Sequence, residues 1–307
     1  MTHELRTKAR LGVLYGIAAY LAWGFIPVYF KLVKQFPPSQ ILGHRILWSV
    51  LLVMIVVACQ RQSSELRACM RSRRTMLWLA ASTTMLATNW FVFIWAVNSN
   101  RVLQASLGYY INPLVNVLLG FLFLGERLRR WQLAAFALAT AAVTMLTFHQ
   151  GQLPWVSLTL AATFGLYGLL RKTAHVGPLI GTAAETLILL PVGLCLVAIG
   201  LWHESHAAAI TGHWWLPLSG IVTIVPLLWF AAATRRLRLA TIGIIQYISP
   251  TCNFLLAVFL YGEPFDRVHL TSFCLIWTAV IIYSADSLRA YWQEGREVEA
   301  AEEMLRE

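Results

Sequence analysis

Long apolar runs separated by short polar segments dominate the chain from residue 11 to residue 286. A helix needs about 20 apolar residues to cross the hydrocarbon core of a bilayer, and these runs predict ten such helices. They are expected to be helical because a backbone in lipid must satisfy its hydrogen bonds within its own segment. The predicted spans are Leu11–Phe30, Ser39–Cys59, Met76–Val97, Leu103–Leu124, Gln132–Phe148, Trp155–Leu170, Leu179–Leu201, Trp214–Thr234, Ala240–Tyr261 and Val268–Asp286.

The composition supports an all-α integral membrane protein. Of the 307 residues, 58% are hydrophobic and 12% are charged, whereas a soluble domain carries about 25% charged residues. So few charges cannot solvate the surface of a soluble globule. This excludes an ordinary soluble enzyme, a disordered chain and a disulfide scaffold.

Neither the cysteines nor the histidines predict a metal site or a cofactor. The five cysteines are scattered without metal-ligand spacing, so packing roles are expected for them. One loop gathers metal-ligating residue types, but their spacing matches no standard zinc motif and favours a solvated loop. Its members are His203, Glu204, His206 and His213.

The basic residues predict the orientation of the spans. Lysine and arginine are frequent in the N-terminal segment, in alternate loops and in the tail. The intervening loops carry only Lys31, Lys34, Arg101 and Arg267. By the positive-inside rule, both termini (1–10 and 287–307) are predicted to be cytoplasmic in a multi-pass inner-membrane protein. The net charge of +10 is therefore a topology signal, and no nucleic-acid partner is expected.

The fourth and ninth spans repeat each other at an offset of 137 positions. Between Tyr110 and Glu126, eight of seventeen positions are identical to those 137 residues later. A weaker match places Gly24 of the first span at Gly165 of the sixth. The chain thus divides into two five-span halves, 11–150 and 151–286. Because five is odd, the second half is predicted to be inverted, as in secondary transporters. A duplicated bundle that only scaffolds another protein is the alternative.

Polar side chains inside the spans are the candidates for substrate binding, because such groups tend to face the bundle interior or a water-filled cavity. The fourth span carries three of them at i, i+3 and i+7, on one helical face, and the ninth carries three at the same spacing. These two stripes either line a shared cavity or form interhelical hydrogen bonds, typically about 0.6 kcal/mol each. The stripes are Tyr109, Asn112, Asn116 and Gln246, Ser249, Asn253, and further candidates are Trp23, Asn89, Trp90, Tyr110 and Tyr247.

Two charged residues, Arg45 and Glu185, lie at equivalent depths of the second and seventh spans. The inversion brings them toward the midplane from opposite faces, so direct pairing is not expected. Glu185 either carries a coupling proton or is a hydrogen-bonded structural residue. Arg45 either faces the interior or extends to the outer interface along its aliphatic stem.

Other residues predict hinges and caps. Pro113 and Pro250 each remove a backbone hydrogen bond in mid-span, and so mark a gating hinge or a static kink. Glu126 and Glu263 end the fourth and ninth spans, where they are expected to cap the following helix or to pair with loop arginines.

Seven segments together resemble the drug/metabolite transporter superfamily, and within it the RarD-type permeases of the EamA group. They are Ala22–Pro27, Arg45–Ser49, Thr88–Asn98, Gly108–Leu114, Pro226–Phe230, Gln246–Pro250 and Tyr261–Glu263. The resemblance implies ten helices, an inverted repeat, a central cavity and small-molecule transport across the inner membrane. Members of this group are commonly labelled chloramphenicol-sensitivity or chloramphenicol-resistance permeases.

The function predicted from these features is a carrier that moves a small organic metabolite or drug by alternating access. The chain has no ATP-binding loop, so a gradient, such as a proton gradient, or exchange must drive it. It is expected to act in the lipid bilayer as a monomer or weak homodimer. A membrane-embedded enzyme and a passive channel are the alternatives, but the spans contain no nucleophile–base pattern.

Overall fold

The structure is a computed structural model that describes residues 3–125, 129–203, 213–234, 236, 237 and 239–304, and its regular elements are all helical. The helices are α1 (His3–Leu32), α2 (Pro38–Cys59), α3 (Ser63–Arg71), α4 (Arg73–Asn98), α5 (Val102–Leu124), α6 (Arg130–Gln150), α7 (Trp155–Ala174), α8 (Pro178–His203), the 3₁₀ turn η1 (His213–Trp215), α9 (Leu218–Thr234), α10 (Leu239–Ile245), α11 (Ile248–Leu255), the π-helical turn η2 (Leu256–Leu260) and α12 (Arg267–Met304).

Local sequence sets several of these boundaries. Pro38 begins α2, where its missing N–H would have no helical partner. The Ser72 hydroxyl caps α4 by accepting a hydrogen bond from the backbone N–H of Thr75. Gly125 and Gly151 end α5 and α6 with φ of 67° and 66°, a left-handed conformation that glycine adopts without steric cost.

Eight segments of the described chain are long and apolar enough, on length and composition, to cross a membrane. They are α1, α2, α4, α5, α6, α8, the segment from α10 to η2, and α12. The predicted spans at 155–170 and 214–234 are helical but do not belong to this set; α9 has 17 residues. Large apolar side chains such as Phe148, 82% exposed, cover the outside of the bundle. The chain is therefore an all-α membrane protein, and the number of ten spans stays a prediction.

The ninth predicted span is broken rather than continuous. It consists of α10, a turn at Gln246 and Tyr247, α11 and η2. Pro250 is the third residue of α11 and has no N–H for the carbonyl of Gln246, which instead accepts a hydrogen bond of 3.3 Å from the N–H of Ser249. Pro113, its equivalent in the fourth span, lies inside the uninterrupted α5. Only the second of the two predicted hinge prolines therefore coincides with a break.

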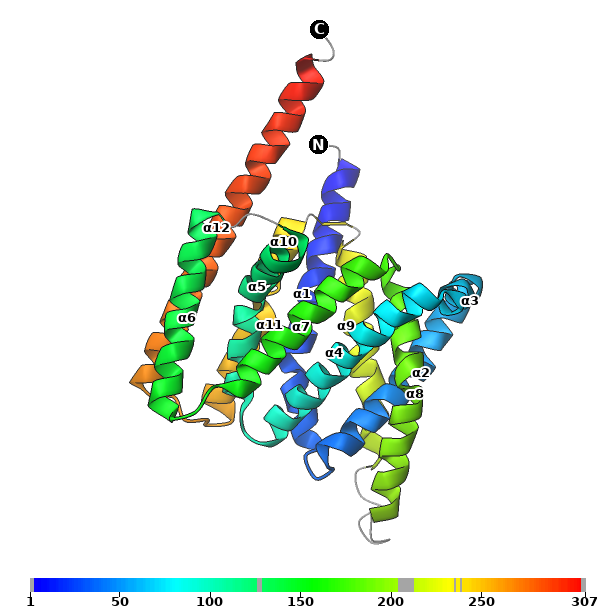
Figure 1. Ribbon diagram of the computed structural model, residues 1–307. Helices are drawn as coiled ribbons and strands as arrows, with labels where there is room; N and C mark the ends of the chain where they lie inside the picture. Colours follow the sequence, from blue (N-terminus) through cyan, green and yellow to red (C-terminus); the bar gives the residue numbers. More distant parts are fainter. Residues whose placement is uncertain (1–2, 126–128, 204–212, 235, 238, 305–307) are drawn as a thin grey trace.

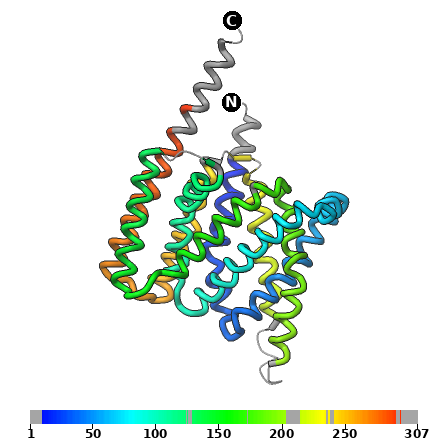
Figure 2. The backbone as a smooth tube through the Cα atoms, viewed as in Figure 1, coloured from blue at the N-terminus to red at the C-terminus, as the bar shows by residue number. Residues whose placement is uncertain are grey.

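The helices form one bundle in which α6 and α12 lie side by side at one edge and α2 and α8 pack together at the opposite edge (Figure 1). Between these edges α7 contacts both α4 and α5, and α1 contacts both α9 and α11. The backbone trace has the same arrangement (Figure 2). Helix α1 enters and α12 leaves the bundle at the same end, which requires an even number of crossings.

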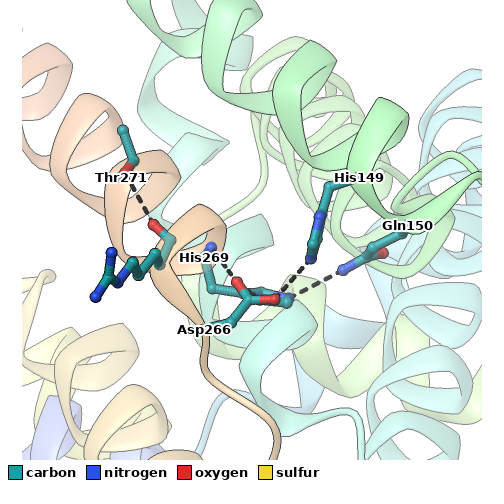
Figure 3. Close-up of polar contacts among 6 residues, drawn as sticks. His149, Gln150, Asp266, His269 and Thr271 are labelled. Atoms are coloured by element: carbon teal, nitrogen blue, oxygen red, sulfur yellow. Dashed lines mark hydrogen bonds and ion pairs between the residues drawn. The ribbon is translucent and has the colours of Figure 1, made fainter.

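Ion pairs join α6 and α12 near both ends of their contact. At one end Nε of Arg129 lies 2.6 Å from Oδ2 of Asp286. At the other end Nε2 of His149 lies 2.6 Å from Oδ2 of Asp266, and His269 contacts the other carboxylate oxygen of Asp266 at 2.9 Å (Figure 3). These contacts join the two helices near both ends, and side-chain packing joins them in between.

Candidate functional site

Arg45 projects from α2 into the interior of the bundle, where only 6% of the residue is exposed. Its Nε donates a hydrogen bond of 2.9 Å to Oγ1 of Thr223 on α9. The guanidinium lies 4.1 Å from the ring centroid of Trp90 on α4 and 5.6 Å from that of Phe30 on α1. Arg45 therefore does not extend to the outer interface, and that alternative is wrong.

Two further predicted residues, Asn89 and Tyr109, lie next to this arginine. The Tyr109 hydroxyl lies near Arg45 and donates a hydrogen bond of 3.2 Å to Oδ1 of Asn89. Nδ2 of Asn89 donates to the carbonyl of Leu160 and to Oγ1 of Thr163 on α7, both at 3.1 Å. We define the Arg45 cluster as Phe30, Arg45, Asn89, Trp90, Tyr109 and Thr223. Both predicted halves contribute to it.

The rest of the first polar stripe faces α7. Nδ2 of Asn112 donates to the carbonyl of Ala161 at 3.1 Å, and Nδ2 of Asn116 donates to Oδ1 of Asn112 at 3.2 Å. These amides therefore hold α5 against α7 in this conformation. A role for them in lining a cavity stays a prediction.

The second polar stripe lies at and beyond the break between α10 and α11. Nε2 of Gln246 donates locally to the carbonyl of Gly243 at 3.0 Å. Asn253 is 1% exposed, and neither of its amide atoms has a hydrogen-bond partner among the described residues. A buried amide without partners costs about 1–3 kcal/mol, so Asn253 is the stripe residue with the most to gain from a ligand. Helix α1 covers this face, with Gly24 packed against Ser249 and Cys252.

The aromatic candidates separate into two places. Tyr110 and Tyr247 stack across the predicted halves, with ring centroids 6.2 Å apart and planes at 17°. Trp23 lies elsewhere and packs on Tyr20 and on Phe230, at centroid distances of 5.3 and 5.6 Å. The structure therefore does not bring Trp23 into the Arg45 cluster.

Glu185 forms a separate buried network in α8. Its Oε1 accepts a hydrogen bond of 2.6 Å from the Ser82 hydroxyl of α4, and its Oε2 accepts one of 3.3 Å from the Tyr167 hydroxyl of α7. Nε of Arg171 lies 3.6 Å from Oε1 and supplies the opposite charge. Glu185 therefore has a basic partner, and that partner is Arg171.

Glu263 binds the start of α5 and not the helix that follows it. Its two carboxylate oxygens accept hydrogen bonds of 2.7 and 2.8 Å from the backbone N–H groups of Val102 and Leu103. Burial raises the pKa of Glu263, while these two hydrogen bonds and Lys31 oppose the increase. The expected cap on the following helix is wrong for this residue, because the N-terminus of α5 lies closer in space. Glu126 lies outside the described residues.

A pocket of about 210 Å³ lies beside Glu263, where α5, α6 and α12 meet. Gln104, Gln150 and His269 also line it. The ligand atoms of His149, Asp266 and His269 lie within 4.8 Å of one another, close enough to hold a metal ion, although hydrogen bonds already link the three side chains. The side chains of the loop group at residues 203–213 are not described.

Sequence reasoning missed several partners of the predicted residues, including Thr223, Phe30, Ser82 and Arg171. Arg171 directly follows the sixth predicted span, where a basic residue indicates topology and not a buried ion pair. The repeat could have indicated the two pairs between α6 and α12. Arg129 and Asp266 are equivalent positions, 137 residues apart, and so are His149 and Asp286, so each pair joins a residue to the equivalent of the other pair's member.

Comparisons with known proteins agree with this architecture. The EamA-like transporter family matches residues 10–148 and 153–285. Protein RarD of Escherichia coli strain K12 is 44% identical over 284 residues, covering 92% of this chain and 96% of the relative. Uncharacterized transporter YojE of Bacillus subtilis strain 168 is 41% identical over 288 residues, covering 92% and 96%.

Two further matches are more distant. Chloramphenicol-sensitive protein RarD of Pseudomonas aeruginosa is 34% identical over 291 residues, covering 93% of this chain and 97% of the relative. A solved crystal structure superposes with a TM-score of 0.55 at 18% identity, covering 91% of this chain and 98% of the other, which supports the fold alone. The chain belongs to the EamA-like transporter family and is one of its RarD-type permeases.

Proposed function

We propose that the protein is a secondary transporter of the bacterial inner membrane that moves a small organic metabolite or drug by alternating access. Two inverted five-span halves, 11–150 and 151–286, would enclose the substrate near the midplane. Both termini would face the cytoplasm.

The observation that carries this proposal is that contacts between the halves recur with the halves exchanged. Helix α4, the third span of the first half, contacts α7, the first span of the second half. With the halves exchanged, the same contact is that of α9 with α1, which is also present. The contact of α5 with α7 recurs as α1 with α11, and that of α2 with α9 recurs as α4 with α8. Equivalent helices also pair directly: α2 with α8, α5 with α11, and α6 with α12. Such recurrence is expected of halves related by a pseudo-two-fold axis, and the odd number of predicted spans in each half would place that axis in the membrane plane.

The recurrence extends to single residues. Gly24 and Gly165 occupy equivalent positions, and an added Cβ would meet Cys252 in one case and Val115 in the other. Cys252 and Val115 are themselves 137 positions apart. Two halves with equivalent contacts and opposite orientation would give two states of similar free energy, each open to one face.

The central polar groups support a small organic substrate. The Arg45 cluster combines aromatic rings with a few directed polar groups, which is typical of small-molecule sites. Glu185 would be the carrier of a coupling proton if a proton gradient drives transport.

Counterflow in proteoliposomes tests the proposal. Purified full-length protein would be screened by thermal shift against metabolites, with chloramphenicol as the first drug, and each stabilising compound would be loaded into the vesicles. A carrier gives transient, saturable accumulation of external labelled compound. Simple equilibration would indicate a channel, and product formation would indicate an enzyme.

Reporter fusions test the inversion separately. The loop 99–101 and the segment 235–238 follow the third span of each half, so inverted halves place them on opposite sides of the membrane. The same side for both would refute the inverted repeat.

A further inference from the structure

Arg45 carries a buried positive charge that no carboxylate of the described residues balances. No acidic group of the described residues lies within ion-pair distance of its guanidinium. The groups that contact it or lie nearby are the hydroxyl of Thr223, the rings of Trp90 and Phe30, and the phenols of Tyr29 and Tyr109. A cation removed from water without a partner has a large desolvation cost, and residues of this kind inside membrane spans mark ligand or ion pathways.

The second half of the chain provides an internal comparison. Glu185 is the counterpart of Arg45 in the second half. Each is bound by a hydroxyl from the other half, Glu185 by Ser82 and Arg45 by Thr223, and these two hydroxyl residues are themselves equivalent, 141 positions apart. The charged partner of Glu185 is Arg171, which is also 141 positions from its equivalent, Phe30. The position that carries the counter-ion in the second half therefore carries an aromatic ring in the first half.

The surroundings of Arg45 suit an anion with a flat apolar body. The Trp90 ring lies against the guanidinium, while the Phe93 ring lies 5.7 Å from that of Tyr109 and 6.1 Å from that of Phe30. A guanidinium presents a planar fork of N–H donors that matches a carboxylate in two parallel hydrogen bonds. With Nε bound to Thr223, the terminal nitrogens make no hydrogen bond to a described residue.

We propose that the substrate is an organic monocarboxylate with an aromatic or other flat apolar body, and that Arg45 binds its carboxylate. This inference rests on the proposed transport function and specifies the substrate class. The anion would be the counter-ion of Arg45, as Arg171, with the opposite sign, is the counter-ion of Glu185 in the equivalent network. Because Arg45 is almost fully buried, the anion reaches it when the halves separate.

The first test needs no ligand. Arg45→Met and Arg171→Met each remove one positive charge from the detergent-purified protein, and thermal unfolding of both is compared with that of the wild type. Arg171→Met is expected to unfold at a lower temperature because Glu185 loses its partner. Arg45→Met is expected to unfold at the wild-type temperature or above, since no anion loses a partner. A decrease for Arg45→Met as large as that for Arg171→Met would show a structural cation and overturn the proposal.

The second test compares benzoate with benzamide, which has a similar shape and no charge. Benzoate is expected to raise the unfolding temperature of the wild type with saturation, and benzamide is not. Arg45→Gln should require at least tenfold more benzoate for the same increase. If Arg45→Gln does not fold, Arg45→Lys replaces it, because lysine keeps the charge without the planar fork; it too should require more benzoate than the wild type for the same increase. The proposal is overturned by equal effects of benzamide or chloride, by no effect of benzoate, or by an unchanged effect in the folded variant.

Counterflow separates this proposal from the transport function. Saturable counterflow of a neutral or cationic compound that Arg45→Gln leaves unchanged would overturn the anion assignment and leave the carrier intact. Benzoate binding that depends on Arg45, without counterflow of benzoate or of any other stabilising compound, would support the anion site and refute transport.

Discussion

The close contact of α5 with α7 at Gly108 provides a quantitative test of how the predicted halves pack. A Cβ added at Gly108 would lie 2.6 Å from the carbonyl oxygen of Ser157 and 3.0 Å from its Cα. Ordinary contacts of a Cβ begin at 3.4 Å, so Gly108→Ala must separate these atoms by about 0.8 Å. The obstacle is backbone and not the end of a flexible side chain, so α7 itself has to move.

The magnitude follows from two opposing effects. Inserting a methyl group into a packed contact typically costs about 1–3 kcal/mol. Alanine in a helix interior gains up to about 1 kcal/mol over glycine. Gly168 on α7 isolates the second effect, because nothing lies within 4 Å of a Cβ added there. Gly108→Ala should therefore be less stable than Gly168→Ala by about 1–3 kcal/mol.

Thermal unfolding of both variants and of the wild type in one detergent is the measurement. Gly168→Ala is expected to match or slightly exceed the wild type, and Gly108→Ala to fall below Gly168→Ala. Equal stability of the two variants would contradict the close contact of α5 with α7, and with it the helix arrangement around the Arg45 cluster.

Three further predictions concern carboxylates. The backbone N–H and imidazole of His269, together with His149, hold the pKa of Asp266 far below its usual 3.8. A carboxylate whose pKa is lower in the folded than in the unfolded protein stabilises the fold at any pH above the unfolded pKa. The stability that Asp266 contributes should therefore decrease as the pH falls below about 3.8. Unfolding of Asp266→Asn, measured against pH, should lack this decrease. Glu263→Ala leaves the first two backbone N–H groups of α5 without acceptors, so the free energy of unfolding should decrease by about 2 kcal/mol or more in denaturation measurements. Glu185→Gln should keep substrate binding and lose pH-driven transport in proteoliposomes; unchanged pH-driven transport would remove Glu185 as the proton carrier.

Hydrophobicity alone locates the helices because the cost of exposing backbone and polar groups to lipid acts on every span in the same way. It does not settle how a span behaves internally. Pro113 and Pro250 occupy equivalent positions and each remove a hydrogen bond, yet α5 is continuous and the ninth span is broken. Because the two prolines are equivalent in the repeat, the proline alone does not decide whether the helix is interrupted.

The candidate residues follow the same division. Arg45, Asn89, Trp90 and Tyr109 were each predictable, because polar and aromatic groups in a span tend to face the interior. That they meet one another, and that Thr223 from another half joins them, depends on how five helices are rotated and packed. Sequence spacing fixes the face of one helix but not its neighbour.

The tie between α6 and α12 at both ends has a practical consequence for observing motion. Two helices that pack closely and carry polar contacts near both ends of their interface are expected to move together as one body. Spin labels placed one on each of these helices should report a constant separation in every state of the protein. The α6–α12 pair would thus provide a fixed internal reference against which displacements of the remaining helices can be measured.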